Sequence, residues 1–215
     1  MSNGSFDFNS FIQESKEVLV NPKSYFSSMK TSGGMTEPLI KAVIYGTIAG
    51  AIAFIWSFLK IGAVAGSILG GGFSIMIFIW YIIGSVIGLF IGAVIMLIIS
   101  SICKGSTDFE ANARVTAAVM VLLPVSALLG IAGHLNLYFG LLVGLAVNIF
   151  SIWLLYNALI EALKAKPETT RIVMYILIAI IVLFSLVGLG AKRRASQFMK
   201  DFDSSEFKEM MEQQK

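Results

Sequence analysis

Few residues in this chain could do chemistry, and their types and spacing fit no catalytic set. His134 is the single histidine and Cys103 is the single cysteine. A multi-histidine metal site is therefore excluded, and a serine nucleophile such as Ser67, Ser74 or Ser85 would have one candidate base. No glycine loop that ends in lysine and serine or threonine is present to hold a phosphate. We expect no enzyme, no metal and no cofactor.

Asn148 and Ser151 are the polar candidates near the middle of an apolar segment. An amide in hydrocarbon needs a hydrogen-bond partner because an unpaired amide is costly. We expect a buried polar pair that either bonds a neighbouring helix or contacts a solute. The predicted spans contain no aspartate or glutamate, which argues against paired-carboxylate proteolysis and acidic proton relays.

The composition places these residues in a membrane protein. Hydrophobic residues make up 57% of the chain and charged residues 13%, against about 25% charged in soluble domains. The mean hydropathy is +0.84. The stretch from Ile61 to Cys103 contains no charged residue, and it is about twice the ~20 residues that cross a bilayer as a helix. A net charge of +3 gives weak support for nucleic-acid binding, so the expected partner is the lipid bilayer and no nucleic acid.

Glycines recur at every fourth residue in several apolar segments. At helical spacing they form a flat face that another helix can approach closely. The predicted packing residues are Gly46, Gly50, Gly62, Gly66, Gly70, Gly84, Gly88, Gly92, Gly140 and Gly144. The run from Gly70 to Gly72 disfavours continuous helix, so the second span is predicted to start near Phe73, after an interfacial or re-entrant segment.

The pattern predicts an all-α fold, a polytopic transmembrane helical bundle with short amphipathic N-terminal helices. The predicted parts are a cytosolic segment 1–37, spans at about 38–59, 73–103, 113–132, 135–160 and 172–190, and a basic soluble tail 191–215. The apolar residues of 6–19 fall near one helical face, which fits a helix on the membrane surface or one docked on the bundle. Pro124 should kink the third span, as a structural bend or a gating hinge.

The distribution of lysine and arginine predicts an N-terminus in the cytosol. With five spans the N-terminal and most loop cations lie inside, whereas Lys192, Arg193 and Arg194 lie outside. The alternative folds 61–103 into a hairpin, gives six spans and returns that cluster to the inside.

The most polar internal segment runs from Lys104 to Arg114. It holds Asp108, Phe109, Glu110 and Arg114, and Asp108 could cap the next helix. This loop is expected to be a solvated connection or a surface that contacts a partner.

The order of these landmarks resembles the Yip-domain family, the Ypt/Rab-interacting membrane proteins and their prokaryotic relatives. The residues that carry the resemblance, over about 18–190, are Pro22, Phe26, Pro38, Gly105, Ser106, Phe109, Arg114 and Pro124. The resemblance implies a five-span, non-enzymatic membrane protein with a cytosolic N-terminus, and small GTPases as partners of eukaryotic members. The long N-terminal region of those members is absent, which favours a prokaryotic-type member in the plasma (inner) membrane.

Two functions remain open on the sequence. The leading hypothesis is a membrane scaffold or adaptor in membrane organisation or trafficking, with a protein partner or self-association. The alternative is a small oligomeric transporter or channel, in which the helix break at 70–72 and the pair Asn148 and Ser151 line a path.

Overall fold

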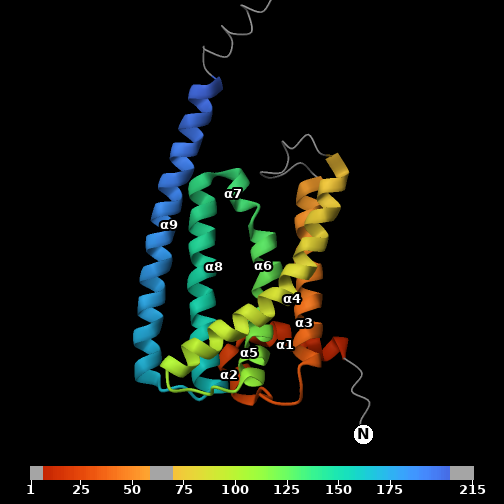
Figure 1. Cartoon of the computed structure of the whole chain (residues 1–215), viewed down its shortest axis with the longest axis vertical. Helices are drawn as coiled ribbons and strands as arrows, with labels where there is room; N and C mark the ends of the chain where they lie inside the picture. Colours follow the sequence, from red (N-terminus) through yellow and green to blue (C-terminus); the bar gives the residue numbers. More distant parts are fainter. Residues whose placement is uncertain (1–6, 59–69, 204–215) are drawn as a thin grey trace, which may run out of the picture. The chain divides into compact units, whose positions relative to one another are not determined.

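The computed structural model describes residues 7–58 and 70–203, and every regular element in them is helical (Figure 1). This confirms the all-α fold class. The elements are α1 (Phe8–Val20), α2 (Pro22–Ser28), α3 (Thr36–Phe58), α4 (Gly70–Ile102), α5 (Phe109–Val119), α6 (Leu122–Leu129), α7 (Ala132–Leu135), α8 (Leu137–Asn157), the π-helix η1 (Ala158–Ala162) and α9 (Pro167–Asp203). The predicted re-entrant segment, with Gly62 and Gly66, lies outside the described residues.

Five helical stretches of the described chain are long and apolar enough to cross a membrane, as the five-span prediction requires. They are Thr36–Trp56, Ile75–Ile102, Phe109–Leu129, Tyr138–Ala162 and Pro167–Ser185. Polar first turns extend several of them beyond the predicted bounds. Glu37, Glu110 and Glu168 lie in such first turns, and Glu161 lies in the last turn of the fourth stretch, so carboxylates are found at the ends of these stretches and not in their middle.

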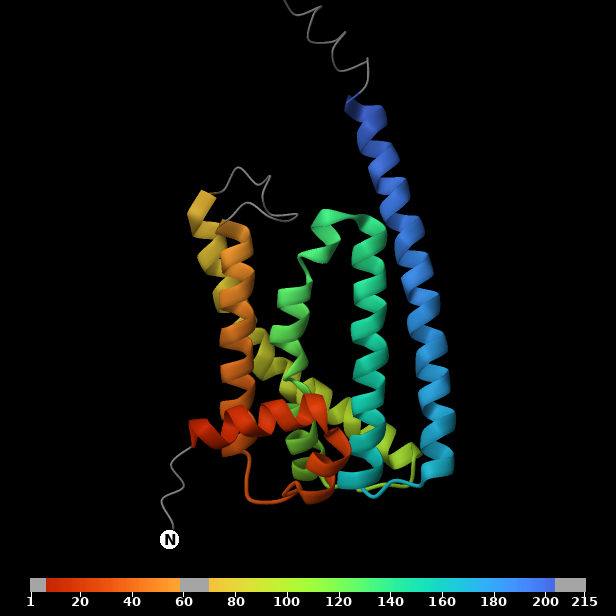
Figure 2. The same cartoon turned by 180° about the vertical axis from the view of Figure 1, so that it is seen from behind.

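Helix α1 begins at an aspartate cap and lies across the ends of α3 and α5 (Figure 2). The Asp7 carboxylate accepts hydrogen bonds from the Asn9 backbone N–H and the Ser10 hydroxyl, which satisfies the free start of the helix. Its Phe11 and Val18 side chains are buried. Pro22 is the first residue of α2, where a missing N–H costs nothing.

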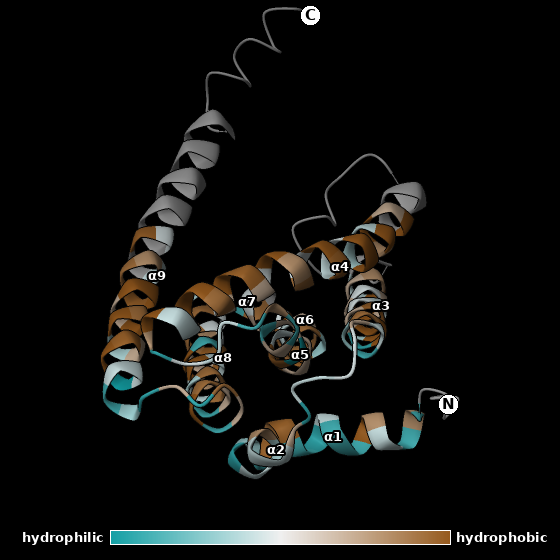
Figure 3. Ribbon diagram, turned by 60° about the horizontal axis from the view of Figure 1, so that its bottom comes forward, coloured by the Kyte–Doolittle hydropathy of each residue, from teal (hydrophilic) through white to brown (hydrophobic). Residues whose placement is uncertain are grey.

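Helix α4 begins at Gly70, three residues before the predicted start, and runs obliquely across α5 and α6 in both cartoon views. It is hydrophobic along most of its length, whereas α1 carries many hydrophilic residues (Figure 3). Its Leu89 packs with Ala42 of α3 and Ala117 of α5 in a buried cluster. The small alanines allow these three helices to approach each other closely.

The third span is interrupted next to Pro124. Helix α5 ends at Val119 and α6 begins at Leu122. Because proline has no N–H to donate to Met120, the Met120 carbonyl instead accepts from the Leu123 N–H at 2.9 Å. A gating role for this break stays a prediction.

Residues from Leu177 onward form a second compact unit. Within it α9 continues to Asp203 and includes Lys192, Arg193 and Arg194. The helix thus extends past residue 190, and the boundary of a soluble tail stays a prediction.

Candidate functional site: an ion-pair network at one end of the bundle

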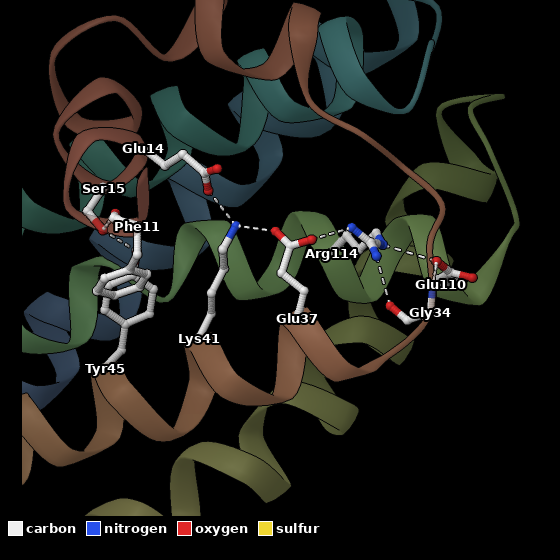
Figure 4. Close-up of polar contacts among 9 residues, drawn as sticks. All are labelled: Phe11, Glu14, Ser15, Gly34, Glu37, Lys41, Tyr45, Glu110 and Arg114. Atoms are coloured by element: carbon white, nitrogen blue, oxygen red, sulfur yellow. Dashed lines mark hydrogen bonds and ion pairs between the residues drawn. The ribbon is translucent and has the colours of Figure 1, made fainter. Parts of the chain in front are cut away.

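Five charged side chains from three helices form a continuous chain of ion pairs (Figure 4). Lys41 Nζ lies 2.7 Å from Glu14 Oε2 and 2.7 Å from Glu37 Oε1. Arg114 Nη1 lies 2.8 Å from Glu37 Oε2, and its Nε lies 3.0 Å from Glu110 Oε1. Glu37 therefore joins the two cations, and the network connects α1, α3 and α5.

Two of these ion pairs follow from the local sequence. Glu37 and Lys41 are four residues apart on α3, and Glu110 and Arg114 are four apart on α5. At this spacing side chains are neighbours on a helix, and a glutamate on the N-terminal side is the favourable order. Both glutamates also lie in the first turn of their helix, where the helix dipole favours negative charge.

The same network fixes the loop that precedes α3. Arg114 Nη2 donates to the Gly34 carbonyl at 2.9 Å, and the Gly34 N–H donates to Glu110 Oε1 at 2.6 Å. Gly33 and Gly34 have φ of 131° and 90°, a region that favours glycine. A Cβ on Gly33 would also lie 2.9 Å from Arg114 Nη2. The loop can therefore accept little change at Gly33.

The two cations are buried and the carboxylates are partly open. Lys41 and Arg114 are each 7% exposed, whereas the Glu37 side chain is 43% exposed. A buried charge is tolerated when it is paired and hydrogen-bonded, and each cation here has two carboxylate partners. Loss of one partner would leave a nearly buried charge undercompensated.

Helix α1 is attached to α3 by Tyr45 as well as by Lys41. The Ser15 hydroxyl and the Tyr45 hydroxyl are hydrogen-bonded at 2.7 Å, and the rings of Phe11 and Tyr45 have centroids 5.0 Å apart. Of the two expectations for this helix, docking on the bundle is what the contacts show. Contact of α1 with a membrane stays a prediction, which the exposed Phe8 and Ile12 side chains leave open.

A polar pocket of about 600 Å³ lies beside the network, between α1, α2 and the start of α3. Glu14, Glu37, Lys41 and Tyr25 are among its lining residues. Tyr25 is buried, and this burial raises the pKa of its hydroxyl to about 12. The partly open Glu14 and Glu37 thus face a space that a solute or a partner side chain could enter.

The structure brings part of the predicted loop into this site. The Asp108 carboxylate caps α5 by accepting from the Ala111 N–H at 2.9 Å, which confirms the expected cap. Phe109 is exposed, whereas Glu110 and Arg114 belong to the network. Arg114 was expected in a solvated connection, and its burial corrects that expectation. Helix α5 starts within the predicted loop, so Arg114 lies on a packed helix.

The sequence prediction missed Glu14, Glu37 and Lys41. The four-residue spacing of Glu37 and Lys41 was the available signal for one pair. No local pattern indicates that Glu14 and Lys41, 27 positions apart, lie in contact.

The predicted polar pair lies elsewhere. Asn148 is exposed and its amide donates to the carbonyl of Gly144, one turn earlier on α8. Ser151 donates likewise to the Val147 carbonyl. Asn148 was expected to be buried and to bond a neighbouring helix. That expectation was wrong, because the side chain is exposed and its own helix supplies the acceptor.

The predicted glycine faces have different surroundings. Added Cβ atoms would collide with Ser85 at Gly46, with Tyr81 at Gly50, with Thr116 at Gly92 and with Gly133 at Gly140. At Gly84, Gly88 and Gly144 an added Cβ meets no described atom within 4 Å. Gly70 starts α4. A general packing role for the glycine faces stays a prediction.

The described residues contain no group of three or more histidine, cysteine, aspartate or glutamate side chains that could hold a metal ion.

Comparison with known proteins identifies one family. No curated protein and no solved structure matched the chain. The family model described as the Yip1 domain matches residues 16–189, which include every span and the whole ion-pair network except Glu14. The chain is therefore a multi-pass integral membrane protein that belongs to the Yip1-domain family.

Proposed function

We propose that this protein is a non-enzymatic membrane scaffold that holds α1 and α2 as a fixed platform for a protein partner. One observation carries the proposal: nearly buried Lys41 binds Glu14 of α1 and Glu37 of α3 at the same time. An amphipathic helix that only rested on lipid would need no such connection. The ion pairs instead orient α1 relative to the spans.

The outer side of this platform is suited to contact. Phe8 and Ile12 are more than half exposed. Lys16, one turn after Ile12 on α1, and Lys23 of α2 are exposed as well. Apolar side chains next to cations fit an acidic protein surface through burial and charge together. The partner is a second protein or another copy of this chain, and a small GTPase is suggested by the family alone. The N-terminus is placed in the cytosol by this proposal.

The transporter alternative gains no support from the described residues. Asn148 and Ser151, which were to line its path, each hydrogen-bond within α8. The other part of that path was the predicted helix break at 70–72, and these residues are the first turn of α4.

The test is lysine-reactive crosslinking with mass spectrometry on the natively expressed chain. Glu14→Arg places a cation against Lys41 and should release α1, whereas Glu17→Arg makes the same charge change at an exposed position of that helix. We expect a reproducible partner linked through Lys16 or Lys23, lost in Glu14→Arg and kept in Glu17→Arg. Identical links in both variants would contradict the fixed platform. Self-links that are lost in Glu14→Arg would identify another copy of this chain as the partner, whereas self-links in a symmetric oligomer that persist in both variants would favour a pore.

A further inference from the structure

A second, apolar groove of about 710 Å³ lies between α4, the α5–α6 pair and α8. Its walls come from residues between Ile77 and Ile99 on α4, between Thr116 and Ser126 on α5 and α6, and from Ser151 and Leu155 on α8. All of these residues lie in the stretches that can cross a membrane. The groove therefore lies at the depth of the hydrocarbon core.

Glycines make this groove by leaving space. Where α4 meets its neighbours, Gly92 lies against Thr116 of α5, and Ser85 lies against Gly46 of α3. Gly88, between these contacts, and Gly84, next to Ser85, line the groove, and an added Cβ on either meets no described atom within 4 Å. Figures 1 and 2 show α4 running obliquely to the axes of α6 and α8, so the space between these helices, which the groove occupies, is not uniform in width.

We propose that this groove binds the acyl chain of a bilayer phospholipid. The lining runs from Ile77 to Ile99 on α4, a rise of roughly 33 Å at 1.5 Å per residue, which is about the ~30 Å thickness of the hydrocarbon core, so the groove is long enough for one acyl chain. The lining is apolar, and the hydroxyls of Ser85, Thr116 and Ser151 donate to carbonyls of their own helices. These walls therefore offer an acyl chain mainly dispersion contacts.

The dimensions disfavour a helix from a second copy. A helix with its side chains is about 10 to 12 Å across, so a helix from a second copy would seat only one face here and would have to bury further area outside the groove. The exposed lining is also well below the ~800 Å² that each partner buries in a stable protein interface. A chain moving from lipid to the groove gains no hydrophobic energy. Selection rests on close contact with the walls.

This inference does not depend on the scaffold proposal, because the groove and the platform share no lining residue. The experiment uses the full chain in nanodiscs that contain phosphatidylcholine with a photoreactive diazirine in the acyl chain. Sites of attachment are then mapped by mass spectrometry. Gly88→Phe fills the groove, and Ile87→Phe adds the same ring at the adjacent, half-exposed position on the lipid-facing side of α4.

We expect attachment to concentrate on groove residues such as Met96, Ser126 and Leu155. Gly88→Phe should lower it about fivefold, which corresponds to about 1 kcal/mol of lost contacts, and Ile87→Phe should leave it unchanged. Gly84→Leu serves as a second filling variant if Gly88→Phe alters thermal stability. Attachment spread evenly over the lipid-facing residues of α4 in the wild-type chain would overturn the proposal. So would groove attachment that resists filling, or groove contacts made by a second copy of the chain.

Discussion

Glu37 and Arg114 are 77 positions apart in the sequence, yet Glu37 Oε2 and Arg114 Nη1 are 2.8 Å apart. The other oxygen of the same carboxylate binds Lys41 at 2.7 Å. One glutamate in the first turn of α3 thus compensates two nearly buried cations. The loss of this shared carboxylate would therefore affect both cations at once.

Glu37→Gln should weaken the ion-pair network while it keeps the volume of the side chain. Lys41 keeps Glu14, and Arg114 keeps Glu110, so the loss is partial. We expect the free energy of unfolding to fall by about 1 to 3 kcal/mol, less than the about 3 to 5 kcal/mol of a fully buried pair, because Glu37 is partly exposed. Denaturant titration in detergent micelles measures this, with the exposed Glu17→Gln as control. Equal stability of the two variants would show that the shared carboxylate contributes nothing.

Arg114→Lys should destabilise the loop before α3 although the charge is kept. The guanidinium donates in three directions, to Glu110, Glu37 and the Gly34 carbonyl, and a single ammonium lacks that planar fork. We expect faster amide hydrogen exchange at Gly34 and a loss of about 1 to 2 kcal/mol. Arg171→Lys, at an exposed position, should change neither quantity. Retained protection at Gly34 would mean that glycine conformation alone fixes the loop.

Gly46 and Gly88 should respond oppositely to alanine. At Gly46 the new methyl group collides with Ser85, and overpacking costs about 1 to 3 kcal/mol. At Gly88 it meets no described atom, so better helix propensity should stabilise the chain by up to about 1 kcal/mol. Unfolding titrations combined with light scattering compare stability and mass. Loss of an oligomer in Gly88→Ala would instead favour a packing face for a second copy.

Alkaline pH should weaken the fold through Tyr25. Burial raises the pKa of its hydroxyl from 10.0 to about 12, so the folded state keeps the proton longer than the unfolded state does. The stabilisation is complete below pH 10 and is lost between pH 10 and 12, by up to about 3 kcal/mol at about 1.36 kcal/mol per pKa unit. Tyr25→Phe should remove this contribution and make the slope shallower, whereas Tyr175→Phe, at a position 70% exposed, should leave the slope unchanged. Equal slopes in all three chains would exclude Tyr25 as the cause.

The sequence was sufficient for the helices and insufficient for their contacts. Long uncharged runs and basic or polar breaks predicted five spans, and Asp108 was recognisable as a cap because its effect is local. The orientation of Asn148 could not be predicted, since α8 is apolar on all sides and gives no preferred face. The pairing of Glu14, Lys41 and Arg114 depends on three helices meeting. Glycines at equal spacing also differ in their surroundings. Gly46 contacts Ser85, whereas Gly88 faces open space, and the sequence does not show which helix faces each glycine.

The burial of α5 has a consequence for how the protein is made. Residues Ala111 to Ala118 are all buried, including Asn112, Arg114 and Thr116, and the span that contains them has the lowest hydropathy of the five. Such a segment enters lipid poorly by itself, because arginine and amide groups are expensive there. Its partners Glu37 and Leu89 precede it in the chain and are synthesised first. Membrane integration of the third span should therefore depend on the first two, and a truncated chain that lacks them should leave α5 outside the bilayer.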